Sequence, residues 1–152
     1  MVDNERSFAR EPEWLGTEQP VKIYSALKKG QPVALFATPT APDGYNGPIQ
    51  ILVGIHIDGT ISGVRVLNHK ETPGLSDGID EEKSNWILGF TGRSIQNPSP
   101  DRWYLKKDGG AFDQYTGATI TQRAIVRATS KFLEYFKSHR EQLFTVKSAE
   151  NE

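Results

Sequence analysis

The chain contains no cysteine and no long apolar run. Without cysteine, disulfides, iron–sulfur ligation and thiol catalysis are all excluded. A membrane-spanning helix needs roughly 18–20 uninterrupted apolar residues. The longest apolar stretch, Ile49–Ile57, has the length of a strand and contains polar residues. The three histidines are scattered without zinc-like spacing, so the sequence predicts no metal site.

The chain also lacks a surplus of charge of one sign. Its 18 Lys and Arg residues nearly balance its 19 Asp and Glu residues, which leaves a formal net charge of -1. This balance argues against general nucleic-acid binding, which needs a basic surplus or stripe. With 152 residues, 36% of them apolar and 24% charged, the chain suits one globular domain.

The N-terminal residues lack both the apolar core of a secretory signal and a clear periodicity. We therefore expect residues 1–20 to be a flexible lead-in, truncated from a membrane anchor, with Trp14 and Leu15 docking on the core. A single domain is expected over residues 21–144. Residues 145–152 are expected to form a disordered tail.

The next part of the chain has the pattern of a β-sheet. Val21–Ala26 and Pro32–Thr38 have the length of strands, and every second residue of Ile49–Ile57 is a branched apolar one, which places five such side chains on one face. Asp58-Gly59 then supplies a hairpin turn. The apolar phase of the returning strand shifts at Ser62-Gly63, which is typical of a β-bulge. These features predict a four-stranded antiparallel meander with one covered face.

Two helices are expected to cover that face. Asp77–Phe90 carries apolar residues at helical spacing, and the segment from about Thr119 to His139 has a longer apolar stripe. Trp103–Leu105 is a candidate short strand between them. The sequence therefore predicts an α+β fold, an antiparallel sheet packed by helices.

The start of the last helix has the chemistry of an anion site. Unpaired N–H groups and the positive end of the helix dipole lie there. Gly117 and Ala118 would let a phosphate approach the backbone, and Thr116, Thr119 and Thr121 supply three hydroxyls. Because Thr and Gly precede many helices, an ordinary N-cap explains the same residues.

This segment resembles the flavinylation motif of the FMN-binding domain found in RnfG (RsxG) and in the C subunit of the sodium-translocating NADH:quinone reductase. The motif is an Asp followed by Ser/Thr-Gly-Ala-Thr, here Asp113 and Thr116–Thr119. Further runs resemble RnfG in the same order: ATPTAPDGYNGPIQILVG at Ala37–Gly54, HKETPGL at His69–Leu75 and KKDGGAFDQYTGATIT at Lys106–Thr121.

The resemblance implies that Thr119 carries FMN through a phosphoester at the N-terminus of the C-terminal helix. Asp113, Thr116, Gly117, Ala118 and Thr121 would then belong to the cofactor-binding segment, with no catalytic residue of its own. A threonine hydroxyl is a poor nucleophile without an activating base. The nearby candidates for a base are Asp113 and Asp108, and no histidine lies in the segment. The resemblance therefore also implies a separate flavin transferase that attaches FMN from FAD.

The resemblance implies contacts to the flavin ring from a second segment. In RnfG-like proteins the segment that matches Glu71, Thr72, Gly74 and Leu75 borders the ring, with backbone groups at its pyrimidine edge and Leu75 on its face. The same residues are also typical of a plain strand-to-helix loop. His69 is expected to be an ordinary surface histidine.

Other residues near the motif are weaker candidates. Lys106 and Lys107 are both candidates for a positive charge near the phosphate or the reduced flavin, and Lys106 is the one assigned to the site. At least one of the two is expected to be a solvated turn residue. Tyr115, next to the motif, is the aromatic residue favoured for a flavin contact. Trp86 and Trp103 are expected to be core residues.

Taken as a member of this family, the chain is expected to be an electron-transfer subunit of a membrane-bound, ion-translocating Rnf-type complex. Its partners would be the other complex subunits and the flavin transferase, and its place the bacterial inner membrane, with the domain facing the periplasm. One alternative is a module that binds a phosphorylated ligand without a covalent bond. Another is a stand-alone flavin enzyme.

Overall fold

The computed structural model describes residues 2–115, 117 and 119–143, with side chains from residue 7 onward. Thr116, Ala118 and the predicted tail at residues 145–152 lie outside the described residues. The elements in chain order are β1 (Val2–Ala9), α1 (Pro12–Leu15), β2 (Val21–Lys28), β3 (Gln31–Ala37), β4 (Thr40–Ala41), β5 (Ile49–His56), β6 (Ile61–Asn68), the 3₁₀ turns η1 (Asp77–Ile79), η2 (Trp86–Phe90), η3 (Pro100–Arg102) and η4 (Lys106–Asp108), and α2 (Thr119–Ser138).

All the described strands form one antiparallel sheet, which confirms the α+β class. Its path runs β1-β2-β3-β5, β6 pairs with β5, and the short β4 also pairs with β5. β5 lies between β3 and β6, with Leu35 opposite Ile55 and Val53 opposite Val64. The strict alternation of β5 is explained by this central position, because Ile49, Val53 and Ile55 are fully buried on the covered face.

The predicted bulge between β5 and β6 is confirmed. Gly54 pairs with Gly63 and Ile55 with Ile61, so Ser62 is the extra residue. Gly54 has no room for a side chain, because a Cβ atom there would lie 2.3 Å from the Ser62 hydroxyl oxygen. The bulge allows Ile61 and Val64 to point to the same face of the sheet despite their odd separation.

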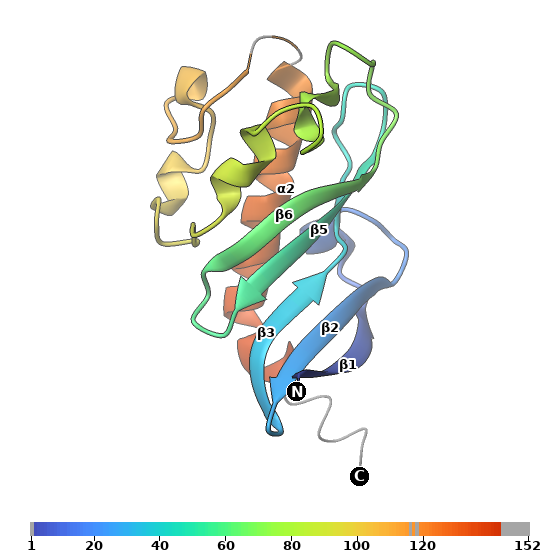
Figure 1. Cartoon of the computed structure of the whole chain (residues 1–152), viewed down its shortest axis with the longest axis vertical. Coiled ribbons are helices and arrows are strands. Elements are labelled where there is room, and N and C mark those ends of the chain that lie inside the picture. The colour runs from blue at the N-terminus through green and yellow to red at the C-terminus, as the bar shows by residue number, and fades with distance from the viewer. Residues whose placement is uncertain (1, 116, 118, 144–152) are drawn as a thin grey trace.

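The core lies between the sheet and α2, which crosses one face of the sheet along the long axis of the molecule (Figure 1). Ile125 and Phe132 of α2 are fully buried, as is Leu15 of α1. α2 begins and ends close to the predicted bounds. None of the helices in the described part of the chain is long and apolar enough to cross a membrane.

The first 20 residues contain more regular structure than the sequence predicted. Val2–Ala9 forms the edge strand β1, paired along its length with β2, and Pro12–Leu15 forms α1. Edge strands often carry charged residues, which protect the open edge from further pairing. The mixed charges of this segment therefore concealed a strand. The sheet has six strands instead of the predicted four.

The prediction of an α-helix over Asp77–Phe90 was wrong. The segment forms the two separate turns η1 and η2, which bury Ile79, Ile87 and Phe90. Ser84 explains part of the interruption, because its hydroxyl accepts a hydrogen bond from the Trp86 N–H (3.1 Å) and so competes with helical pairing.

The prediction of a short strand at Trp103–Leu105 was also wrong, because these residues form no strand in the described part of the chain. Leu105, between η3 and η4, forms only a single β-bridge, to Phe112 after η4. Trp103 is nevertheless a core residue, as predicted, with 2% of its surface exposed. Its indole N–H is held by the Ser94 and Pro98 carbonyl oxygens, both at 3.0 Å.

The fold predicts which positions on α2 control stability. Replacing the fully buried Phe132 with Ala should lower the free energy of unfolding by about 3–5 kcal/mol, because it leaves a cavity between helix and sheet. The exposed Lys137→Ala on the same helix should change it by no more than about 0.5 kcal/mol. Urea unfolding followed by circular dichroism would measure both, and equal midpoints would contradict this packing.

Candidate functional site

The first turn of α2 lies against the loop that follows β6. Gly117, just before the helix, has a φ of +126°, and a Cβ atom there would lie 2.8 Å from the Leu75 carbonyl oxygen. Only glycine combines this backbone conformation with so close an approach. The two segments that the sequence marked as candidates, Glu71–Leu75 and the run that ends at Thr119, therefore meet at one place.

Thr119 is the first residue of α2 and is partly exposed. Its hydroxyl oxygen accepts a hydrogen bond from the Lys107 ammonium group (3.1 Å), and the Gly117 carbonyl oxygen lies 3.4 Å away. A cation therefore lies beside the hydroxyl at a helix N-terminus, where the unpaired N–H groups also favour an anion.

The loop after β6 forms a tight turn. The Thr72 carbonyl oxygen accepts from the Leu75 and Ser76 N–H groups (3.1 and 3.0 Å), and Gly74 has a φ of +76°. The Thr72 N–H donates to the Ser76 hydroxyl oxygen (2.9 Å) and the Gly74 N–H to Asp77 (3.0 Å). These amides are thus used within the turn, so a ring placed here would meet carbonyl oxygens and the 60% exposed Leu75 side chain.

Glu71 differs from the rest of this turn because its carboxylate is buried. Only 4% of its surface is exposed. The carboxylate accepts hydrogen bonds from the Tyr45 N–H (2.9 Å), the Asn46 N–H (2.8 Å) and the hydroxyl of Thr121. None of the ion pairs among the described residues involves Glu71, so these three donors stabilise its charge.

This cluster revises what the sequence suggested for two residues. Thr121 is fully buried and donates its hydroxyl to Glu71, instead of standing at the surface beside Thr119. Glu71 joins β6 to the loop at residues 44–47 and to the first turn of α2. Any ring contact from Glu71 would have to come from its backbone, because the side chain points into this cluster.

Tyr115 connects the segment before α2 to the turn after β6. Its hydroxyl donates to the Ser76 carbonyl oxygen (3.1 Å), and its ring lies so close to Gly78 that a Cβ atom there would be 2.9 Å from it. Gln122 pairs with both the N–H and the carbonyl of Tyr115, each at 3.1 Å. Burial raises the pKa of Tyr115 to about 12, helped by nearby Asp77.

The two lysines of η4 have different partners. Lys106 forms an ion pair with Asp113, and this contact holds the pKa of Asp113 below its ordinary value. Lys107 reaches Thr119. The sequence favoured Lys106 as the cofactor-side cation, whereas the structure puts Lys107 beside the hydroxyl. Because the two lysines are adjacent in the sequence, the sequence alone could not show which of them lies beside Thr119.

An ion pair fixes η4 against α2. Arg123, one turn after Thr119, donates two hydrogen bonds to the Asp108 carboxylate, both at 2.7 Å. These bonds lower the pKa of Asp108 and raise that of Arg123. The sequence suggested Asp108 only as a candidate base, whereas here it forms a salt bridge that positions Lys107.

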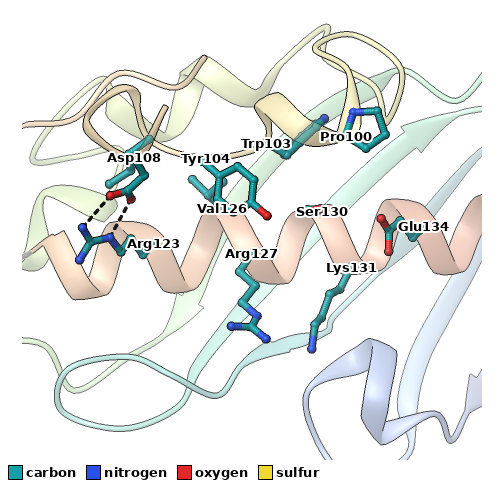
Figure 2. Close-up of a pocket in the computed structure, with 11 residues that line it drawn as sticks. Pro100, Trp103, Tyr104, Asp108, Arg123, Val126, Arg127, Ser130, Lys131 and Glu134 are labelled. Carbon is teal, nitrogen blue, oxygen red and sulfur yellow. Dashed lines mark hydrogen bonds and ion pairs between the residues drawn. The ribbon is translucent and has the colours of Figure 1, made fainter. Parts of the chain in front are cut away.

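Beyond this ion pair, a cleft follows α2 away from Thr119. It has a volume of about 520 Å³ and lies between α2 and the segment that contains η3 and η4. Figure 2 shows the Asp108–Arg123 pair at one end of the cleft, with Arg127 and Lys131 further along the helix. Tyr104 and Trp103 line the opposite wall.

Two further residues differ from the expectation in opposite directions: His69 is more enclosed than the sequence suggested, and Trp86, expected in the core, is only partly buried. His69 is only partly exposed: its Nδ1 accepts from the Glu71 N–H (3.0 Å) and its Nε2 lies 2.9 Å from the Asp80 carboxylate. Trp86 packs beside the core and donates its indole N–H to the Asp113 carbonyl oxygen (2.7 Å). Over the described residues, no group of three or more histidine and acidic side chains is placed to hold a metal ion.

Comparison with known proteins decides the family. The model of the FMN-binding domain matches residues 44–134, which include the loop after β6, η4 and most of α2. The chain belongs to the FMN-binding domain family.

This FMN-binding domain is similar to the G subunit of the ion-translocating oxidoreductase complex from several bacteria. It is 54% identical to the protein of Vibrio cholerae strain O395 over 129 residues, 85% of this chain and 62% of the relative. It is 49% identical to the protein of Pseudomonas aeruginosa strain UCBPP-PA14 over 138 residues, 91% of this chain and 64% of the relative. The chain thus spans less than two thirds of the length of these relatives.

A solved structure confirms the fold. The crystal structure of NqrC from Shewanella oneidensis superimposes with a TM-score of 0.63 over 91% of this chain and 68% of the other. The sequence identity is 21%, so the likeness concerns the fold of the FMN-binding domain.

The Glu71 cluster can be tested by removing its charge. Glu71→Gln presents an NH₂ group where two backbone N–H groups and a hydroxyl converge, so at least one donor loses its acceptor. The free energy of unfolding should fall by about 1–3 kcal/mol. Glu82→Gln, at an exposed carboxylate, should change it by no more than about 0.5 kcal/mol. Equal urea midpoints for the two variants would show that the cluster does not hold the loop.

The pKa of Tyr115 gives a second test. An unfolded tyrosine ionises near pH 10, and Tyr115 in the folded domain near 12. Its contribution to stability is therefore complete below pH 10 and is lost as the pH rises from 10 towards 12. Phenolate absorbance is titrated in the wild type and in Tyr115→Phe. The difference between the two curves belongs to Tyr115 and should have its midpoint near pH 12. A midpoint near 10 would contradict the partly buried hydrogen bond to Ser76.

Proposed function

We propose that this domain carries FMN as an electron-transfer group, attached to the Thr119 hydroxyl through a phosphoester. The observation that carries the proposal is the position of Thr119 at the start of α2, partly exposed, behind a glycine that leaves no bulk and beside the Lys107 ammonium group. Membership of the FMN-binding domain family and the match of Asp113 and Thr116–Thr119 to the flavinylation motif support it.

The described residues suit an attached phosphate. A phosphodiester keeps one negative charge, and the cation beside Thr119 and the amides of the first helical turn both favour an anion there. Two nearby carboxylates, Asp108 and Asp113, are each paired with a cation, so they do not oppose it. When bound, FMN supplies reversible electron transfer through its ring, while the phosphate fixes it to the chain.

Thr119 has no base of its own, which favours attachment by another enzyme. No histidine or unpaired carboxylate contacts its hydroxyl among the described residues, whose partners there are Lys107 and Gly117. A threonine hydroxyl needs activation before it attacks phosphorus. A flavin transferase that uses FAD as donor is therefore the proposed partner for this step.

We further propose that the chain is the FMN-carrying part of the G subunit of an Rnf-type, ion-translocating oxidoreductase complex. The 54% and 49% identity to relatives of that name supports this assignment. The other subunits would donate and accept its electrons. In this proposal the full-length protein is anchored in the bacterial inner membrane and the domain faces the periplasm.

The attachment can be tested on the denatured chain. Protein produced together with a flavin transferase should keep its yellow colour after denaturation and gain the mass of one FMN less one water. Thr119→Ala should abolish both, whereas Thr119→Ser, which keeps a hydroxyl, should retain a substantial fraction. Mass spectrometry of proteolytic peptides would locate the modification.

One control variant and two possible results separate this proposal from its alternatives. Thr60→Ala removes a hydroxyl far from the site, in the turn between β5 and β6, and should leave the modification unchanged. Colour that is lost on denaturation would overturn the covalent link and favour a module that binds a phosphorylated ligand. Steady NADH turnover by the isolated domain with a small acceptor would favour a stand-alone enzyme.

A further inference from the structure

We propose that Lys107 is the residue of this chain that receives the phosphate at Thr119. Its ammonium group orients the acceptor hydroxyl before modification and binds the phosphodiester afterwards. This inference rests on the proposed attachment to Thr119 and adds a specific role for one side chain. Neither the motif nor the family match assigns that role.

The hydrogen bonds of the Thr119 hydroxyl to the described residues use its proton and only one of its two lone pairs. A hydroxyl has one proton to donate and two lone pairs. The proton points to the Gly117 carbonyl oxygen at 3.4 Å, and one lone pair accepts from the Lys107 ammonium at 3.1 Å. The second lone pair has no partner among the described residues. It is the lone pair with which the oxygen can attack phosphorus.

One contact of Lys107 and two contacts of nearby residues hold the turn around it, so its side chain extends from a fixed base. The Lys107 N–H donates to the Gln114 side-chain oxygen (3.1 Å). The next residue, Asp108, is joined to Arg123 on α2 by two hydrogen bonds. Gly110 closes the turn with its backbone so near Tyr104 that a Cβ atom would lie 1.9 Å from the Tyr104 carbonyl oxygen.

The charges around Thr119 single out Lys107. The neighbouring cations Lys106 and Arg123 are each paired with a carboxylate, Asp113 and Asp108. Lys107 lies near enough to Asp108 to lower the pKa of that carboxyl, but Arg123 makes its hydrogen bonds. Lys107 is therefore the cation that donates to the acceptor hydroxyl, and it can turn to phosphate oxygens without breaking an ion pair of the described residues.

The reaction that Lys107 would assist balances without a redox change. The Thr119 oxygen forms a bond to the phosphorus of the FMN half of FAD, and the bond between the two phosphates breaks. AMP leaves with the bridging oxygen, and the hydroxyl proton passes to water. Lys107 then faces the non-bridging oxygens of the new diester, a charge-assisted contact.

Three single variants test this role with the whole chain, purified flavin transferase and FAD. Lys107→Met should lower the initial rate of modification about tenfold, because it removes the positive charge that faces the phosphate oxygens while the new bond forms. Lys107→Arg should restore part of the rate. Lys83→Met, an exposed lysine on another turn, should stay within about twofold of the wild type. Intact-mass spectrometry over time gives the rates.

A second measurement separates phosphate binding from recognition by the transferase. The ³¹P resonance of the modified domain should move in Lys107→Met, brought to full modification by long incubation, and should not move in Lys83→Met. Because Lys107 is exposed, we expect the unmodified variants to have the urea midpoint of the wild type. Unchanged midpoints would exclude a loss of folding as the cause of a lower rate.

The outcomes distinguish this inference from the proposed function. If the wild type is modified at Thr119 while Lys107→Met matches it in rate and in ³¹P shift, the role of Lys107 is wrong and the attachment stands. A fourth variant, Lys106→Met, is measured in the same way, and a loss confined to it would assign the role to Lys106, as the sequence first suggested. If the wild type is never modified at Thr119, both proposals fall together.

Discussion

The candidate site depends on one buried carboxylate. Glu71 joins three segments that are far apart in the sequence: the loop at residues 44–47, the end of β6 and the first turn of α2. A buried charge without a cation is stable only if hydrogen bonds replace its hydration. Here two backbone amides and one hydroxyl do so. The same carboxylate therefore holds the loop and fixes the position of the first turn of α2 relative to it.

Around this fixed point, the site is built from contacts that leave Thr119 accessible. The Gly117–Leu75 approach and the Tyr115–Ser76 hydrogen bond hold the segment before α2 from one side. The Asp108–Arg123 ion pair holds η4 from the other. These contacts engage the neighbours of Thr119 and leave its own hydroxyl with one long and one charge-assisted contact. Rigid surroundings and an accessible hydroxyl are the combination that the proposed modification would need.

The sequence predicted those parts of the fold in which burial follows a regular period. The alternation of β5 and the stripe of α2 were correctly interpreted because one face of each packs against the other. β1 was missed because an edge strand does not need an apolar face. The helix predicted over Asp77–Phe90 failed because apolar side chains at helical spacing can also be buried by successive 3₁₀ turns, as Ile79 and Phe90 are here.

For the candidate site, too, the sequence identified what is encoded locally and missed what depends on long-range contacts. The motif at Thr116–Thr119 marked the start of α2 without any knowledge of the fold. The partners of that turn could not be found locally, because Glu71 and Thr121 are 50 residues apart and meet only in the folded chain. Lys107 could have been chosen over Lys106 only by knowing where each side chain points. Long-range contacts, rather than residue types, carried the missing information.

The direction of α2 sets how far the candidate site reaches. The helix has 20 residues, which at 1.5 Å per residue is a rod of about 30 Å. Thr119 stands at one end of this rod, and Figure 1 shows the start of β1 at the opposite end of the molecule, near the end of α2. Any structure that binds the domain at β1 would therefore leave Thr119 at the far end, so that the domain would also act as a spacer between that structure and Thr119.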